Sequence, residues 1–376
     1  MENVKISARQ LAILVILFSV GTTILVIPGS LASVVKQDAW MAAIFGTVSS
    51  FLVVALYIAI GRIFPAMTLA EILESVLGKW LGKFISLSFV FFAFFDASDL
   101  IYYAGNFLTT QILLYTPIEA IHIILACILL MGVRLGLETV ARAAELFFPV
   151  FIFLFVLLVG SVLLTSDLWK LQNLEPILFT GIKPMIRAVF IFLSSFSFPL
   201  IVILMIFPSS VKQPKKAEKS LFIAISTAGV CLTILIILTI LVLGPETSAR
   251  QMYPSYNLAQ SIKIGDFLQR IEAILAIMWL ITIFFKMVIY FYAAIISFGQ
   301  TLNIRDYRPF TFPFGMLVVV LSLYSHPNVT HSAKFDYEIW PVYSLIYGLA
   351  LPLLLLLIYG LKKYIKHEKK RKLPLE

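Results

Sequence analysis

Charged residues are scarce in this sequence. Only 29 Lys or Arg and 20 Asp or Glu occur among 376 residues, so charged residues make up 13% of the chain, about half the share found in a water-soluble globule. Hydrophobic residues make up 61%. Because a bilayer-spanning helix needs roughly 20 mostly apolar residues, this composition is sufficient for about ten spans. It excludes a cytosolic enzyme, a disordered chain and a disulfide scaffold.

Metal-binding and catalytic residue types are scarce as well. The two cysteines, Cys127 and Cys231, lie far apart in apolar runs and form no CxxC motif. The sequence contains no nucleotide-binding loop and no zinc spacing. Its four histidines do not cluster with acidic residues at ligand spacing: His122, His326, His331 and His367. The sequence therefore predicts no metal, no cofactor and no enzymatic activity.

Long stretches without charge mark the predicted membrane spans. Two of the spans are extended backwards through buried charge, one from Phe84 past Asp96 and Asp99, the other from Ile271 past Lys286. We predict an all-α integral membrane protein, a single transmembrane domain over residues 1–376 with ten transmembrane helices: 10–35, 39–61, 84–118, 120–133, 146–166, 188–211, 220–245, 271–304, 309–333 and 339–361.

The basic residues between these spans predict the orientation. With the N-terminus in the cytoplasm, 20 of the 29 Lys and Arg fall inside, eight fall outside, and Lys286 alone lies within the membrane. Both termini are therefore predicted to be cytoplasmic. The basic tail, residues 362–376, follows an apolar helix, so it is expected to lie at anionic lipid headgroups rather than on nucleic acid.

Two spans contain helix-breaking residues at matching positions. The first span has Gly, Thr and Pro within residues 21–30, and the sixth has Ser and Pro within residues 194–199. Since the two spans run in opposite directions, the breaks indicate inverted five-helix repeats at about 9–166 and 184–361, as in the amino acid permease type of fold. One break alone would be weak support, because Gly, Ser and Pro are common in membrane helices.

Broken helices are tolerated in a membrane where their backbone lines a cavity or meets a ligand. A half-helix beginning near Ile27 would point N–H groups at an anion such as a carboxylate, and facing carbonyls would suit an ammonium group. An amino acid carries both. The predicted ligand-binding residues are Gly21, Thr22, Thr23, Ile27, Pro28, Asp96, Asp99, Tyr103, Ser194, Ser195, Ser197 and Thr282.

Buried charges fall near the middle of two spans. Asp96, Asp99 and Tyr103 share one helical face, and Lys286 lies close to the face of Thr282. A charge at the bilayer centre costs about 3 kcal/mol, so these side chains should face the bundle interior and find partners. We predict that Asp99 pairs with Lys286. The pair has a structural interpretation as a salt bridge and a functional one in ligand binding or coupling; absence of contact is the third alternative.

A ladder of alternating charge opens the fifth predicted span. Its members are spaced four, four and three residues apart: Arg134, Glu138, Arg142 and Glu145. Helix-surface pairs at the cytoplasmic boundary are the simplest interpretation, each worth a few tenths of a kcal/mol. A gate or a docking surface for a partner is the alternative.

The sequence resembles a known family over essentially its whole length, and two segments are the best markers of this resemblance. They are residues 6–10, which lead into Gly21 and Pro28, and residues 135–149, which contain the charge ladder and end in Pro149. The sequence resembles the B subunits of spore germination nutrient receptors, within the amino acid-polyamine-organocation superfamily. The resemblance implies a germinant-sensing subunit in the inner membrane of an endospore, beside an A-type membrane subunit and a C-type lipoprotein subunit.

Two functions remain open from the sequence. In the first, a small nutrient binds between the broken helices and shifts the chain toward a signalling conformer; an amino acid is favoured over a sugar or nucleoside. In the second, the protein is a proton-coupled amino acid permease, in which Asp99, Lys286 or Glu272 carries a proton or replaces sodium. A purely structural scaffold explains neither the paired breaks nor the buried charge.

Overall fold

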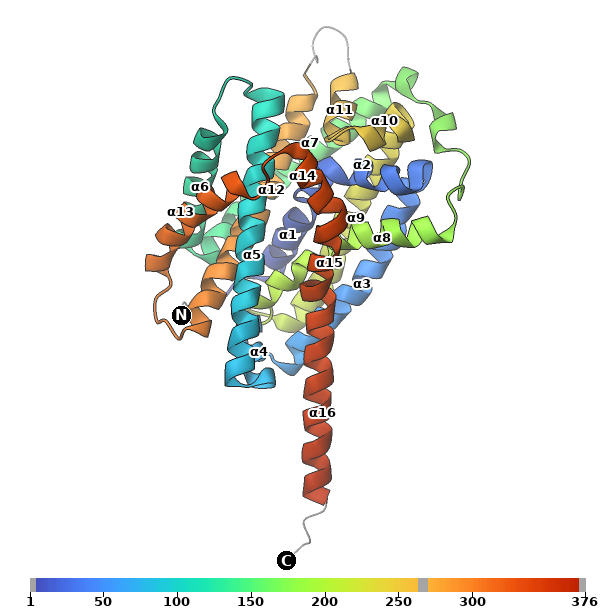
Figure 1. Cartoon of the computed structure of the whole chain (residues 1–376). Coiled ribbons are helices and arrows are strands. Elements are labelled where there is room, and N and C mark those ends of the chain that lie inside the picture. Colours follow the sequence, from blue (N-terminus) through green and yellow to red (C-terminus); the bar gives the residue numbers. More distant parts are fainter. Residues whose placement is uncertain (1–4, 263–269, 372–376) are drawn as a thin grey trace, which may run out of the picture.

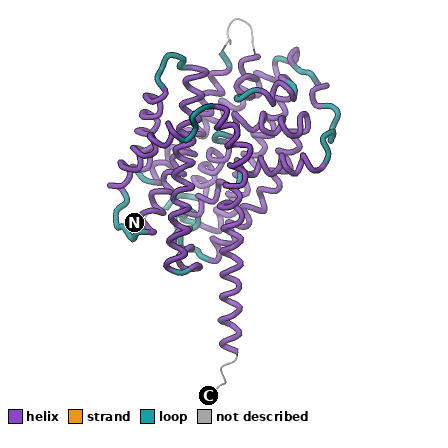
Figure 2. The backbone as a smooth tube through the Cα atoms, viewed as in Figure 1, coloured by secondary structure: helices purple, strands orange, loops and turns teal. Residues whose placement is uncertain are grey.

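The computed structural model describes residues 5–262 and 270–371, with the backbone alone for 366–371. Regular structure in these ranges is helical except for one isolated bridge between Ile6 and Val211 (Figure 2). The first half contains the helices α1 (Ala8–Val20), α2 (Thr23–Val35), α3 (Ala39–Ile63), α4 (Leu69–Leu77), α5 (Lys79–Phe107), α6 (Ile118–Leu135) and α7 (Leu137–Leu164).

The second half is less regular. It contains α8 (Ile182–Phe196), the 3₁₀ helix η5 (Phe198–Met205), α9 (Pro214–Leu243), α10 (Pro245–Arg250), α11 (Pro254–Ser261), α12 (Glu272–Thr301), α13 (Arg308–Tyr324), α14 (Val329–Lys334), α15 (Trp340–Leu345) and α16 (Leu351–Arg371). Two π-helical turns, η6 (Phe335–Ile339) and η7 (Ile346–Ala350), interrupt the last helical run. Such turns are frequent at functional sites.

Eight helices of the described part are long and apolar enough to cross a membrane. Two apolar helices are shorter, α1 with 13 residues and α13 with 17. Large apolar side chains lie exposed on the outside of the bundle. Leu52 and Phe84, for example, are each more than two-thirds exposed. A soluble protein rarely exposes such a surface. The prediction of an all-helical integral membrane protein is confirmed; the count of ten spans and the inverted repeats stay predictions.

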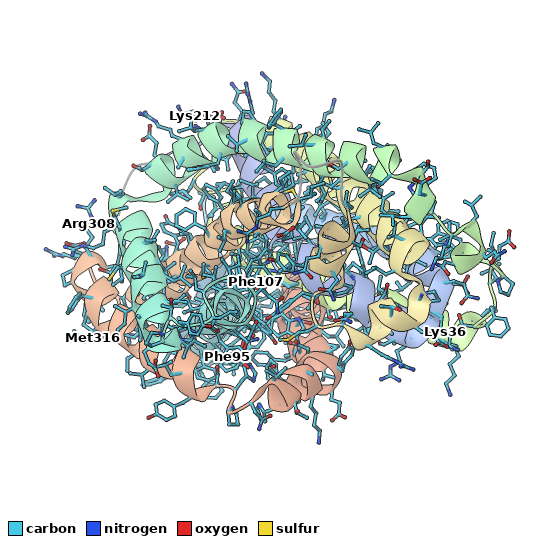
Figure 3. All side chains as sticks on the ribbon, turned by 90° about the horizontal axis from the view of Figure 1, so that it is seen from above. Lys36, Phe95, Phe107, Lys212, Arg308 and Met316 are labelled. Carbon is cyan, nitrogen blue, oxygen red and sulfur yellow. The ribbon has the colours of Figure 1, made fainter. Side chains whose placement is uncertain are left out.

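Four helices pack against one another through the bundle: α5, α12, α1 and α9. Helix α12 packs along α5, and α1 packs along α9 and α12. Every residue of α1 from Ile13 to Val20 is buried, although the helix is only 13 residues long. Seen from above in Figure 3, Lys36, Lys212 and Arg308 lie at the rim of the bundle and Phe107 lies inside it. Helix α16 leaves the bundle and extends toward the C-terminus (Figure 1).

Candidate ligand site

The first predicted break lies between α1 and α2. Only Gly21 and Thr22 are outside the two helices. A Cβ atom at Gly21 would lie 2.5 Å from Cδ of Lys286 and 2.8 Å from the carbonyl oxygen of Phe18. Glycine is therefore required here because the lysine side chain runs across the break at close approach.

The break is shorter than the sequence suggested. We expected residues 21–29 to be irregular, but Ile27, Pro28 and Gly29 belong to α2. Pro28 has no N–H to donate to the carbonyl of Ile24, four residues earlier. The hydroxyl of Ser255 donates to that carbonyl instead, at 2.6 Å. Because a side chain from α11 supplies the missing hydrogen bond, the helix continues through the proline.

The second predicted break lies between α8 and η5. Helix α8 ends at Phe196, Ser197 lies outside regular structure, and an eight-residue 3₁₀ helix follows. A 3₁₀ helix of this length is unusual and leaves backbone groups poorly bonded. The phenol of Tyr57 donates to the carbonyl oxygens of Phe198, at 3.1 Å, and of Gly348, at 2.6 Å. One tyrosine of α3 thus stabilises two irregular segments.

The two breaks meet around Lys286. The ammonium group of Lys286 donates to the hydroxyl of Thr22, at 3.2 Å, and to the carbonyl oxygen of Ser195, at 3.4 Å. The hydroxyl of Thr23 donates to the same carbonyl, at 3.3 Å. Ser195 lies in the last turn of α8, where the helix dipole favours a cation. The ring of Phe18 lies 5.4 Å from the ammonium nitrogen and contributes a cation–π contact.

A cavity of about 70 Å³ adjoins this junction. A buried water needs about 10–15 Å³ of such cavity volume, so the cavity has room for about five to seven waters. Polar and apolar side chains from six elements line it: Thr22, Thr23, Val26, Ile27, Ser30, Asp96, Asp99, Leu100, Tyr103, Ile191, Ser195, Lys286, Tyr290, Asp336 and Trp340.

Three carboxylates lie on the wall of the cavity. Asp99 bonds to Nε2 of His326 at 2.6 Å, and Asp336 accepts a hydrogen bond from the phenol of Tyr103, also at 2.6 Å. Asp96 is 5% exposed, and its Oδ2 atom has no hydrogen-bond partner among the described residues. A buried acceptor without a partner is costly. Asp96 therefore carries a buried acceptor on this wall that no described group satisfies.

The predicted pairing of Asp99 with Lys286 is not formed in this structure. Asp99 bonds to His326, and Lys286 bonds to Thr22 and Ser195, although both charged residues line the same cavity. The two charges were expected to pair because they lie at similar depths in the membrane. Backbone carbonyls at the end of a broken helix also solvate an ammonium group, and the depth of a charge does not reveal such partners.

The structure separates the predicted ligand residues into two groups. One group lines the cavity: Thr22, Thr23, Ile27, Asp96, Asp99, Tyr103 and Ser195. The other supports it from outside: Gly21, Pro28, Ser194, Ser197 and Thr282. Thr282, for instance, donates to the carbonyl oxygens of Trp279, at 2.9 Å, and Gly21, at 3.5 Å.

Four residues at the site were missed from the sequence. Asp336 lies in the π-helical turn η6 and Trp340 is the first residue of α15, both at the edge of the last predicted span. Tyr290 lies one turn after Lys286 on α12. His326 was set aside because its acidic partner is 227 positions away in the chain. The four-residue spacing of Lys286 and Tyr290 on one helix is the signal that could have identified Tyr290.

The predicted charge ladder is divided between two helices. Gly136, with φ of 86°, separates Arg134 at the end of α6 from the other three members in α7. Arg142 pairs with Glu138 one turn earlier. Glu145 instead contacts the N-terminal segment, where the amide of Gln10 donates to it at 3.0 Å. Arg134 therefore lies on a different helix from the other three members, because Gly136 ends α6, while the contact between Arg142 and Glu138 is a helix-surface pair of the expected kind.

Comparison with known proteins identifies the family. Residues 5–330 match the spore germination protein family. This match covers well over half of the sequence. The chain belongs to the spore germination protein family. This match confirms the resemblance inferred from the sequence motifs of the chain. The family belongs to the APC-like transporters.

Individual relatives align over nearly the full chain. Spore germination protein KB of Bacillus subtilis (strain 168) is 28% identical over 373 residues, 98% of each chain. Spore germination protein YndE of the same organism is 26% identical over 362 residues, 96% of this chain and 97% of the relative. Spore germination protein A2 is 26% identical over 355 residues, 92% and 93% of the two chains. As a member of this family, the chain is a B-type germinant receptor subunit, permease-like and not an enzyme.

Proposed function

We propose that this chain binds a small zwitterionic nutrient, an amino acid, in the cavity at the two helix breaks. The observation that carries the proposal is the pair of opposite charges on the cavity wall. Asp96 offers a carboxylate oxygen without a partner, and Lys286 lies on the same cavity. A ligand with an ammonium and a carboxylate group satisfies both.

The donors and acceptors on the wall fit the two ends of such a ligand. A lysine ammonium has three N–H donors, and Lys286 uses two of them on Thr22 and Ser195. The third is left for a ligand carboxylate. Thr22, which directly precedes α2, lies beside it, and the side chain of Thr22 makes no capping hydrogen bond in the described part of the chain. The first N–H groups of a helix lack partners inside the helix and attract anions.

The size of the cavity favours an amino acid over a sugar. Room for about five to seven waters corresponds to a similar number of heavy atoms, which is the size of the smallest amino acids. A hexose has about twice as many heavy atoms, and a nucleoside more. Larger ligands therefore require the cavity to open further.

Binding at this place provides a means of signalling. The ligand would contact α2, α5 and α12 together and would favour the conformer in which the two breaks lie against each other. We propose that this shift is passed to an A-type membrane subunit and a C-type lipoprotein subunit in the inner membrane of the spore. The proposal includes ten spans in two inverted repeats and both termini in the cytoplasm.

A proton-coupled amino acid permease is the second candidate. The observation that favours it is the ammonium group of Lys286 at the junction of the breaks. In permease-type folds a buried lysine can occupy the place of a sodium ion. The same cavity would then open to each side of the membrane in turn.

Two assays test these functions. The purified protein should be stabilised against heating by one or more amino acids but not by sugars or nucleosides. Asp96→Asn should abolish that stabilisation, and Glu338→Gln, at an exposed position, should keep it. Stabilisation by a sugar alone would contradict the amino acid proposal. Uptake into liposomes separates sensor from permease, because gradient-driven accumulation by the isolated chain would support the permease.

A further inference from the structure

A chain of three hydrogen-bonding side chains connects the cavity with the protein surface. Oδ1 of Asp99 lies 2.6 Å from Nε2 of His326, and Nδ1 of His326 lies 3.1 Å from Nδ1 of His331. His326 is 3% exposed, whereas His331 is exposed. Asp99 lines the cavity. One end of the chain therefore lies at the protein surface and the other reaches the ligand site.

The surroundings hold the middle member in place. The ring of His326 packs against Tyr102, with ring centroids 4.9 Å apart, and against Phe335, at 5.2 Å. The backbone N–H of His331 donates to the side chain of Asn328 at 2.8 Å, which caps the short helix α14. Packing therefore holds the ring of His326, and the cap fixes the backbone from which the side chain of His331 extends.

We propose that His331, His326 and Asp99 form a path that carries a proton between the surface and the cavity. An ionised Asp99 can only accept, so Nε2 of His326 carries the proton between them. Nδ1 of His326 is then the acceptor, and Nδ1 of His331 is the donor. This arrangement leaves Nε2 of His331 with a lone pair, which can take a proton from solvent.

The transfer is balanced along the chain. A hydronium ion gives a proton to Nε2 of His331 and leaves water, while the Nδ1 proton of His331 passes to Nδ1 of His326. The Nε2 proton of His326 passes to Oδ1 of Asp99. One N–H bond forms and one breaks on each ring, one O–H bond forms on Asp99, and one positive charge has entered the cavity. Imidazole groups suit this role because their ordinary pKa lies near neutrality.

Other titratable groups surround this path and set its electrostatic background. From α5 they are Asp96, Tyr102 and Tyr103; from α14 and η6, Lys334, Asp336 and Glu338; from α12, Lys286; and from the segment before α11, Tyr253. Protonation of Asp99 removes one negative charge from the cavity wall, so an ammonium ligand is bound less tightly at low pH. By linkage, binding of that ligand releases a proton. This consequence rests on the proposed function, but the path itself does not.

The path can be tested without any ligand. Vesicles containing the protein are brought rapidly from about pH 7.5 to about pH 5.5 on the side that carries His331, with the other side buffered. Infrared difference spectra should show a protonated carboxyl band that is absent in Asp99→Asn. His331→Gln, at an exposed position, should slow its appearance by about tenfold or more, and His326→Gln should do the same.

Two matched variants serve as controls. His122→Gln changes a buried histidine that bonds to Ser322 elsewhere in the bundle, and Val329→Ala changes another exposed residue of α14 without changing its charge. Both should leave the rate unchanged. The proposal is overturned if the wild type shows no Asp99 band, if His331→Gln protonates Asp99 as fast as the wild type, or if the band responds only to pH on the opposite side.

Discussion

Substitution of Gly21 by alanine tests the junction of the two breaks. The new Cβ would lie 2.5 Å from Cδ of Lys286 and 2.8 Å from the carbonyl of Phe18, whereas ordinary contacts are at least 3.4 Å. The lysine would have to move by about 1 Å, which would weaken or break its hydrogen bonds to Thr22 and Ser195. Hydrogen bonds to a charged group are worth about 1.5–3 kcal/mol each, so we expect a loss of about 3–6 kcal/mol.

Thermal unfolding followed by tryptophan fluorescence measures this loss. Gly160→Ala is the matched control, because no atom outside its own helix lies within 4 Å of a Cβ at that position of α7. Alanine is favoured over glycine in a helix by about 1 kcal/mol, so the control should be neutral or stabilising. In a Lys286→Ala background the clash with Cδ is removed, and Gly21→Ala should cost less there. Equal Tm values for Gly21→Ala and Gly160→Ala would refute the reasoning.

Three further predictions concern other parts of the molecule. Lys215→Cys should react with a membrane-impermeant thiol reagent only from the cytoplasmic side and Lys334→Cys only from outside; the reverse pattern would contradict the orientation. Tyr57→Phe leaves two buried carbonyl oxygens without their donor and should cost about 1–3 kcal/mol, measured as a lower Tm, whereas Tyr324→Phe at an exposed position should cost nothing measurable. Asp96→Asn should weaken amino acid binding by about ten- to a hundredfold, read from a ligand titration, since it removes one charged hydrogen bond; unchanged affinity would exclude Asp96 from the site.

Composition and local residue types predicted much of the fold. Long apolar stretches identified the helices, since a segment of that length without charge is stable only when its backbone is bonded within a helix. Glycine and serine clusters located both breaks. Their extent was harder to predict, because Pro28 stays helical with the help of Ser255 from a distant segment.

The partners of the buried charges were the weakest part of the sequence prediction. Asp99 and Lys286 line one cavity, but the depth of a residue in a span does not determine its neighbours. The partner of Asp99 is His326, which lies in the connection after α13 and is far away in the chain. Contacts of this kind depend on how the connections fold back over the bundle, and hydrophobic periodicity carries no information on that.

The central claim is that the ammonium group of an amino acid meets Asp96 in the cavity. Solid-state NMR on the membrane-embedded protein can measure this contact directly, through dipolar coupling between a ¹⁵N-labelled amino acid and ¹³C-labelled aspartate carboxyl carbons. The account predicts a coupling that corresponds to hydrogen-bond contact in the wild type and is lost in Asp96→Asn. Binding of the amino acid without such a coupling, or a coupling that persists in Asp96→Asn, would contradict it.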